Sequence, residues 1–310
     1  MAVRMMLRPV EKMPERLGLY GGPGVGKTLG ALSIIAAGLG PGETAWVVDT
    51  DNSYARFEQR FEGVLTAREW WTGGGDVRVM DGMERVGDWE TQGGNVVVLQ
   101  PSTWPEFRAC MTRVWAEAKR GDWVLVDSLT WPWQWIMYWY IEQVHGNGLP
   151  QFLMDYRVQQ LKDGKGDVTG AGATLVEYNV VNKWWVEAFA GPFVNARCHV
   201  VVIAEAKEVR TDAFGGDKAD VRKLYGKQGM KPVTQNRVGH NCQTLLYLEQ
   251  EPTVKDSWLV STVKDRERAV RLSRVKVGYA GLGGEEAEAP GLDKVYLRDV
   301  AGWTMRKVEV

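Results

Sequence analysis

The chain has 310 residues, 45% of them hydrophobic and 25% charged, and its 38 basic residues nearly balance its 39 acidic ones. This composition excludes a mainly disordered chain, and the length excludes a small scaffold that depends on disulfides. The near-zero net charge gives no support for nucleic-acid binding by the surface as a whole, so such binding would depend on local patches.

The cysteines and the apolar runs point to a cytoplasmic protein without a membrane partner. Cys110, Cys198 and Cys242 lie far apart and form no CxxC pair, so we expect neither a zinc cluster nor a disulfide framework. The start of the chain lacks the apolar segment of a signal peptide. The most apolar run, Trp131–Ile141, is too short to span a bilayer.

Strand and helix patterns alternate along the first half of the chain. An apolar run at Leu17–Tyr20 leads into a glycine-rich loop and then into a helical pattern. Buried strands are predicted at 45–49, 77–80, 95–99 and 123–128, with a helix at 103–119. This alternation predicts an α/β fold with a mostly parallel, doubly wound sheet, whose ligands bind at the carboxyl ends of the strands.

The second half adds helices at 130–143 and 175–189 and strands at 199–206, 244–248 and 258–263. We interpret residues 1–277 as the core, with long polar insertions at about 145–174 and 206–237. Residues 278–293 are expected to form a linker or loop. Residues 294–310 alternate around a turn, which predicts a C-terminal β-hairpin.

The glycine-rich loop matches the phosphate-loop pattern G-x-x-x-x-G-K-[ST] in full. Its residues are Gly21, Gly22, Pro23, Gly24, Val25, Gly26, Lys27 and Thr28. Glycines let successive backbone amides point at a phosphate, and the following helix adds the positive end of its dipole. We therefore expect ATP here, with Lys27 on its β and γ phosphates and the Thr28 hydroxyl on Mg²⁺.

Carboxylates at strand ends complete the expected site. Asp127 ends the apolar run Trp123–Val126, as a Walker B aspartate does, and is expected to hold Mg²⁺ through water. The next residue is Ser128 and not the catalytic Glu of many ATP motors. The water-orienting base is therefore expected on the earlier strand, at Asp51, with Asp49 as the alternative.

The order GGPGVGKT, VVDTD, VLVDSLT and HVVVIAEA over residues 17–276 resembles the RecA/RadA/DnaB superfamily of P-loop ATPases. Size and spacing look closest to phage-encoded RecA-like ATPases of the single-strand-annealing recombination type. The resemblance implies a RecA-like core, a catalytic role for Asp51 and a γ-phosphate sensor at Glu205. The family has Glu and Gln at these two places, so this chain departs from its pattern at both.

The resemblance also implies an active site shared between subunits. Lys264 and Arg266 match the family's K-x-R element, which reaches the nucleotide of a neighbouring subunit. A cation placed there stabilises charge on the transferring phosphate. Self-association as a ring or filament follows, and a solvated basic turn is the alternative interpretation.

Single-stranded DNA is the expected partner, because the family holds DNA on loops that correspond to 145–174 and 206–237. The second segment has four more basic than acidic residues, and Tyr225 is placed to stack on a base. The candidate DNA-binding residues are Arg210, Arg222, Lys223, Lys227, Lys231 and Arg237. The aromatic run 131–140 is expected to pack in the core or between subunits, and the three histidines to be structural.

The sequence thus predicts a Mg²⁺-dependent ATPase that binds single-stranded DNA and acts, with partner proteins, in recombination, repair or replication. Two alternatives remain open at this point. One is a P-loop kinase of a small molecule, with 206–237 as its lid. The other is a nucleotide-gated assembly or loader protein with little turnover. A packaging motor is disfavoured, because Ser128 follows Asp127 and no clustered carboxylates indicate a nuclease.

Overall fold

A computed structural model describes residues 3–8, 14–40, 42–54, 65–72, 76–80, 95–146, 175–210, 217–235, 237–251, 257–266, 271–278, 291–301 and 304–309, and a few single positions between 148 and 162. Its strands are β1 (Val3–Arg8), β2 (Arg16–Gly21), β3 (Thr44–Asp49), β4 (Leu65–Thr72), β5 (Asp76–Met80), β6 (Asn95–Leu99), β7 (Trp123–Asp127), β8 (His199–Glu208), β9 (Met230–Pro232), β10 (Thr244–Gln250), β11 (Ser257–Asp265), β12 (Val275–Gly278) and β13 (Thr304–Glu309).

The α-helices are α1 (Lys27–Gly38), α2 (Trp104–Glu117), α3 (Thr130–His145), α5 (Leu175–Trp185), α6 (Gly191–Asn195), α7 (Ala219–Tyr225) and α8 (Val238–Asn241). Two π-helical segments are η3 (Val186–Ala190) and η4 (Lys294–Val300). No helix in the described ranges is long and apolar enough to cross a membrane.

One large sheet organises the molecule, in the order β12-β11-β10-β2-β8-β7-β3-β6-β4-β5, with β9 attached to β8. Every neighbouring pair from β10 to β4 is parallel. Only the outer strands at the two edges of the sheet, and β9, pair antiparallel. The prediction of an α/β fold with a mostly parallel, doubly wound sheet is therefore confirmed.

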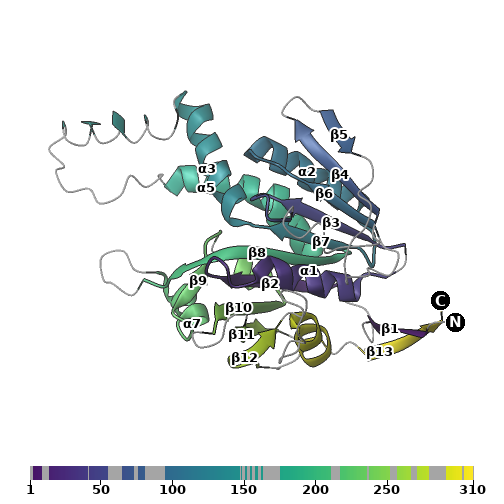
Figure 1. Cartoon of the computed structure of the whole chain (residues 1–310). Helices are drawn as coiled ribbons and strands as arrows, with labels where there is room; N and C mark the ends of the chain where they lie inside the picture. Colours follow the sequence, from purple (N-terminus) through teal and green to yellow (C-terminus); the bar gives the residue numbers. More distant parts are fainter. Residues whose placement is uncertain are drawn as a thin grey trace.

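Helices bury both faces of the sheet, which explains why its central strands read as continuous apolar runs. Side chains alternate along a strand, so Leu17 and Leu19 pack toward α1 and η4, whereas Tyr20 packs in the cluster that includes α2, α3 and η3. Figure 1 shows α1 and α2 on opposite sides of the sheet. This arrangement leaves the strand ends, and not the faces, for polar groups.

The predicted C-terminal hairpin is wrong. Lys294–Val300 is helical, and Val295, Tyr296 and Leu297 are buried in the core on the α1 side. β13 pairs antiparallel with β1 at the other end of the chain, so that the two termini lie side by side (Figure 1). The alternation in the last residues correctly indicated a strand, but local turn chemistry cannot reveal a partner about 300 residues away.

The second polar insertion, 206–237, is more regular than a long loop. β8 extends to Glu208, and α7 and β9 follow within the described residues. β9 returns antiparallel on β8, with Ala206 opposite Pro232. Most of the first insertion, 145–174, and most of the expected linker, 278–293, lie outside the described residues.

Candidate functional site

The glycine-rich loop connects the end of β2 to the start of α1. Gly24 and Gly26 have φ angles of +73° and +76°, in the left-handed region that favours glycine. At Gly21, a Cβ would lie 2.3 Å from the Leu248 carbonyl oxygen, so the close approach of β10 requires glycine. Gly26 caps α1 without a side-chain hydrogen bond. The first amides of α1 are therefore available to an anion.

Lys27 lies folded over this loop. Its Nζ donates to the carbonyl oxygens of Gly21 and Gly22 at 3.1 and 2.6 Å. Burial lowers the pKa of Lys27, and the negative charges of Asp127, Glu205 and Asp51 oppose this effect. The four charged side chains that the sequence predicted for the site are thus close enough to interact electrostatically.

Asp127 ends β7 and is almost fully buried. Its Oδ2 accepts hydrogen bonds from the Thr28 hydroxyl at 2.6 Å and from the Ser53 hydroxyl at 3.0 Å. Burial and, to a smaller extent, the charge of Asp51 raise the pKa of Asp127 to about 7, and the two hydroxyl bonds act in the opposite direction. Thr28 and Asp127, the two residues expected to hold Mg²⁺, are thus in direct contact, and their role as metal ligands stays a prediction.

The two candidate bases differ sharply in environment. Asp49 is 1% exposed and accepts hydrogen bonds from Gln100 Nε2 at 2.9 Å and from the amides of Ser53 and Tyr54 at 3.0 and 3.2 Å. Asp51 is exposed, and its carboxylate accepts the Ser53 amide at 3.0 Å. Asp49 thus shapes the turn, whereas Asp51 has access to water.

Strand order places Glu205 between the two halves of the site. β8 lies between β2 and β7, and Glu205 is in register with Gly21 at the start of the phosphate loop. The Glu205 amide donates to Thr130 Oγ1 at 3.0 Å, and its carbonyl accepts the Val233 amide at 2.7 Å. These two bonds hold the backbone of Glu205 next to the phosphate loop, and its side chain is exposed.

The donor set at this edge fits Mg²⁺. The Thr28 hydroxyl and the Asp127 carboxylate are hard oxygen ligands, and Mg²⁺ takes few protein ligands because it keeps waters and phosphate oxygens. In the described ranges, no group of three or more His, Cys, Asp or Glu residues offers an all-protein metal cage.

Two residues that sequence reasoning missed belong to this network, Ser53 and Gln100. Ser53 follows the two candidate bases, and Gln100 follows β6 directly. β6 pairs with β3 and β3 with β7, so Gln100, Asp49 and Asp127 lie in a row along one edge of the sheet. Polar residues at the carboxyl ends of consecutive parallel strands were the signal that could have found them.

Lys264 and Arg266 lie at the opposite ends of the parallel strands, where these strands begin. β11 runs antiparallel to β10, so Lys264 pairs with Leu245, whereas the phosphate loop aligns with Leu248. Lys264 Nζ donates to the carbonyls of Gly239, His240 and Cys242 at 2.9, 2.6 and 2.7 Å. Burial lowers the pKa of Lys264 to about 8.

The Arg266 side chain is exposed and donates to the His240 carbonyl. Strand residues rise about 3.3 Å each, so the edge that carries Lys264 and Arg266 lies more than about 10 Å from the chain's own phosphate loop. Neither residue is placed to act on that loop, and their assignment to another subunit's site stays a prediction.

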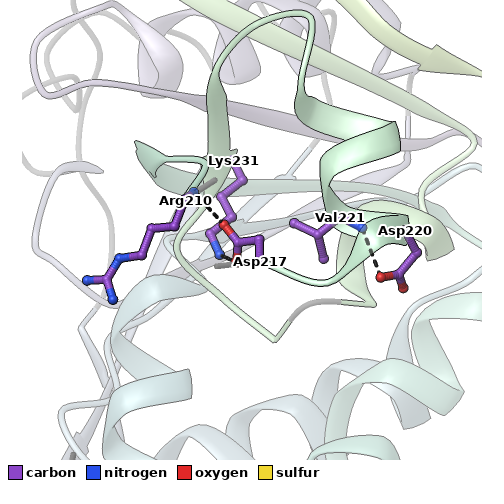
Figure 2. Close-up of polar contacts among 5 residues, drawn as sticks. All are labelled: Arg210, Asp217, Asp220, Val221 and Lys231. Carbon is purple, nitrogen blue, oxygen red and sulfur yellow. Dashed lines mark hydrogen bonds and ion pairs between the residues drawn. The ribbon is translucent and has the colours of Figure 1, made fainter. Parts of the chain in front are cut away.

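The candidate DNA-binding residues divide into exposed and buried ones. Arg210, Arg222, Lys223, Lys227 and Arg237 are exposed. Lys231 is 7% exposed and forms an ion pair with Asp217, whose other oxygen accepts the Arg210 amide at 2.9 Å (Figure 2). Lys231 therefore joins β9 to the segment before α7, and its charge does not reach the surface.

The expectation that Tyr225 stacks on a base conflicts with its position. It is 2% exposed and packs edge-on against Tyr20 of β2, with ring centroids 5.9 Å apart. The aromatic run of α3 packs as predicted at Trp133, which meets Trp185 at 5.4 Å, and at Trp139, which meets Trp184 at 4.9 Å.

Comparisons with known proteins give limited information. No family model matches the chain, and no curated protein matches its sequence. Among solved structures, the crystal structure of the RadB recombinase is similar at 16% identity over 85% of this chain and 86% of that chain, with a TM-score of 0.39. These values are too low to transfer a function, so the residues of this chain have to support any functional conclusion.

Proposed function

We propose that the protein is a Mg²⁺-dependent ATPase of RecA type that binds single-stranded DNA. The observation that carries this proposal is the 2.6 Å contact between Thr28 of the phosphate loop and the buried Asp127 two strands away. It joins both halves of a nucleotide site around Lys27 and an exposed carboxylate, Asp51. This combination suits hydrolysis of a phosphate chain.

Each residue has a distinct task in this proposal. The backbone N–H groups of Gly24–Thr28 bind the phosphates, and Lys27 exchanges its contacts with two loop carbonyls for phosphate oxygens. Asp127 keeps the Thr28 hydroxyl oriented. Asp51 holds the attacking water and accepts its proton, and Glu205 senses the γ phosphate from the strand between. Bound Mg²⁺, held by Thr28 and Asp127, supplies neutralisation of phosphate charge.

The shared site rests on Arg266. Its exposed guanidinium lies at the edge of the sheet opposite the chain's own loop, so it suits the nucleotide of a neighbouring copy in a ring or filament. Lys264, the second half of the K-x-R element, holds the end of α8 with all three of its donors. We therefore assign charge stabilisation at the neighbour's phosphate to Arg266, whereas Lys264 holds the backbone at the end of α8 in place.

Single-stranded DNA would bind beside β8, where the segment 217–237 presents its exposed charges, Arg222, Lys223, Lys227 and Arg237. Val233 bonds the backbone of Glu205, so this segment is attached to the strand that carries the expected sensor. A phage-type role in recombination, repair or replication is consistent with such a link between nucleotide and DNA.

The test is ATP hydrolysis with and without single-stranded DNA, on the wild type and on Lys27→Ala and Arg266→Ala. We expect DNA to stimulate hydrolysis, and both variants to lose it. Mixing Lys27→Ala with Arg266→Ala subunits should restore part of the activity, because some sites then combine an intact loop with an intact arginine. Wild-type protein that neither binds DNA at low salt nor responds to it would contradict the DNA-dependent function, and phosphotransfer to nucleosides would favour a kinase.

A further inference from the structure

Ser53 contacts all three aspartates of the site. Its amide donates to Asp49 Oδ1 and to Asp51 Oδ1, both at 3.0 Å. Its hydroxyl donates to Asp127 Oδ2 at 3.0 Å and lies 3.4 Å from Asp49 Oδ1. The backbone of Ser53 therefore belongs to the turn that carries Asp51, while its side chain reaches the next strand.

The turn is held firmly enough for this contact to be specific. Tyr54 is 1% exposed and packs in the core with α1, and Asp49 is fixed from the other side by Gln100. Thr50 adds a second link, because its amide donates to the Asp127 carbonyl at 2.6 Å. Asn52, between Asp51 and Ser53, takes a positive φ of 58°.

A hydroxyl has only one proton, so Ser53 can donate to a single carboxylate at a time. The shorter distance assigns that proton to Asp127. Asp127 Oδ2 also accepts the Thr28 hydroxyl of the phosphate loop. One carboxylate oxygen thus joins the loop that would hold the phosphates to the turn that would hold the water.

We propose that Ser53 is a positioning residue that couples Asp127 to Asp51, so that the water-orienting carboxylate is aligned only when Asp127 is engaged with the phosphate loop. This inference rests on the proposed ATPase function. Ser53 itself touches neither nucleotide nor water in this scheme. It acts by fixing the turn and by orienting Asp127, as outer partners of ligating carboxylates generally do.

The test compares Ser53→Ala with Ser53→Thr, which restores the hydroxyl. Ser53→Ala should lower kcat about tenfold, leave the KM for ATP within about twofold, and raise the Mg²⁺ concentration needed for half-maximal ADP binding about tenfold. Metal-free ADP binding should not change. Ser53→Thr should recover most of both losses, whereas a merely structural serine would show no Mg²⁺-specific effect.

Ser257→Ala is the matched control, because the Ser257 hydroxyl also bonds a carboxylate, Glu251 at 2.9 Å, outside the site. It should leave kcat and Mg²⁺ dependence at wild-type values. Wild-type kcat and wild-type Mg²⁺ dependence in a folded Ser53→Ala protein would overturn the inference and leave the ATPase proposal intact. A wild-type protein that binds no nucleotide would overturn both.

Discussion

Polar side chains are used differently where the parallel strands begin, here called the amino edge, and where they end, here called the carboxyl edge. At the amino edge, several polar side chains accept hydrogen bonds from backbone amides: His199 accepts the Glu15 amide, Asp122 accepts the amides of Thr44 and Lys119, and Gln243 accepts the Arg16 amide. At the carboxyl edge, side chains instead bond one another, from Thr28 through Asp127 to Ser53 and from Asp49 to Gln100.

Two lysines make the same contrast. Lys264, at the amino edge, gives all three of its donors to carbonyls and has Arg266 as a nearby like charge. Lys27, at the carboxyl edge, contacts two loop carbonyls and lies among three carboxylates. The first is saturated and stabilises the fold, whereas the second can exchange its partners for a ligand.

The largest expected effect comes from removing the exchangeable lysine. Lys27→Ala should reduce ATP hydrolysis by at least about 100-fold, because a cation aimed at the transferring phosphate is lost. Its free energy of unfolding should change by less than about 1 kcal/mol, since the loop at Gly22–Gly24 is partly exposed and water can take the place of the lysine there. Hydrolysis assays and urea unfolding of the same preparation would measure both. Retained hydrolysis, or a large loss of stability, would contradict the view that Lys27 serves the site and not the fold.

His199 tests the amino edge through pH. Burial lowers the pKa of His199 to about 4, from about 6.5 in the unfolded chain. Between these values the unfolded state binds more protons, so stability should fall as the pH decreases through this window, by up to about 3 kcal/mol. Urea unfolding of His199→Gln over the same range should show a smaller loss. Parallel curves for the two proteins would show that His199 is not responsible.

The saturated lysine should matter for stability alone. Lys264→Met leaves three carbonyls without their donor and should lower the free energy of unfolding by about 2 kcal/mol. Arg266→Ala, on an exposed side chain two residues away, should change it by less than about 0.5 kcal/mol. Equal effects of the two substitutions in thermal or urea unfolding would contradict the structural role of Lys264.

A smaller effect than that of Lys264→Met is expected at the contact that anchors the C-terminal segment. The Tyr296 hydroxyl donates to Glu15 Oε2 at 2.8 Å, and both residues are buried. Tyr296→Phe removes this one bond and should cost about 1 kcal/mol in urea unfolding, with ATP hydrolysis unchanged. A change in hydrolysis would mean that the amino edge also controls the site.

The sequence predicted the carboxyl edge far better than the amino edge. Gly21–Thr28 and Asp127 belong to a local pattern, and a run of buried strands sets where their ends meet. Ser53 and Gln100 carry no motif, and their role depends on which strands are neighbours. The sequence suggested Lys264 as one half of the K-x-R element, because sequence spacing does not reveal the α8 carbonyls to which this lysine donates.

The ends of the chain were predicted least well. The hairpin expected at 294–310 is a helix followed by a strand that pairs with β1, a contact between the two extremes of the chain. Lys231 was expected to present its charge to DNA, but it forms an ion pair with Asp217. In both cases the deciding partner lies outside the local pattern.

Titration of Mg²⁺·ADP into wild type, Lys27→Ala and Lys264→Met tests most directly whether the carboxyl edge is a nucleotide site. At a temperature where all three proteins are folded, we predict that the wild type and Lys264→Met bind with the same affinity and that Lys27→Ala binds at least about tenfold more weakly. Equal affinity of all three proteins, or no binding by the wild type, would contradict the account.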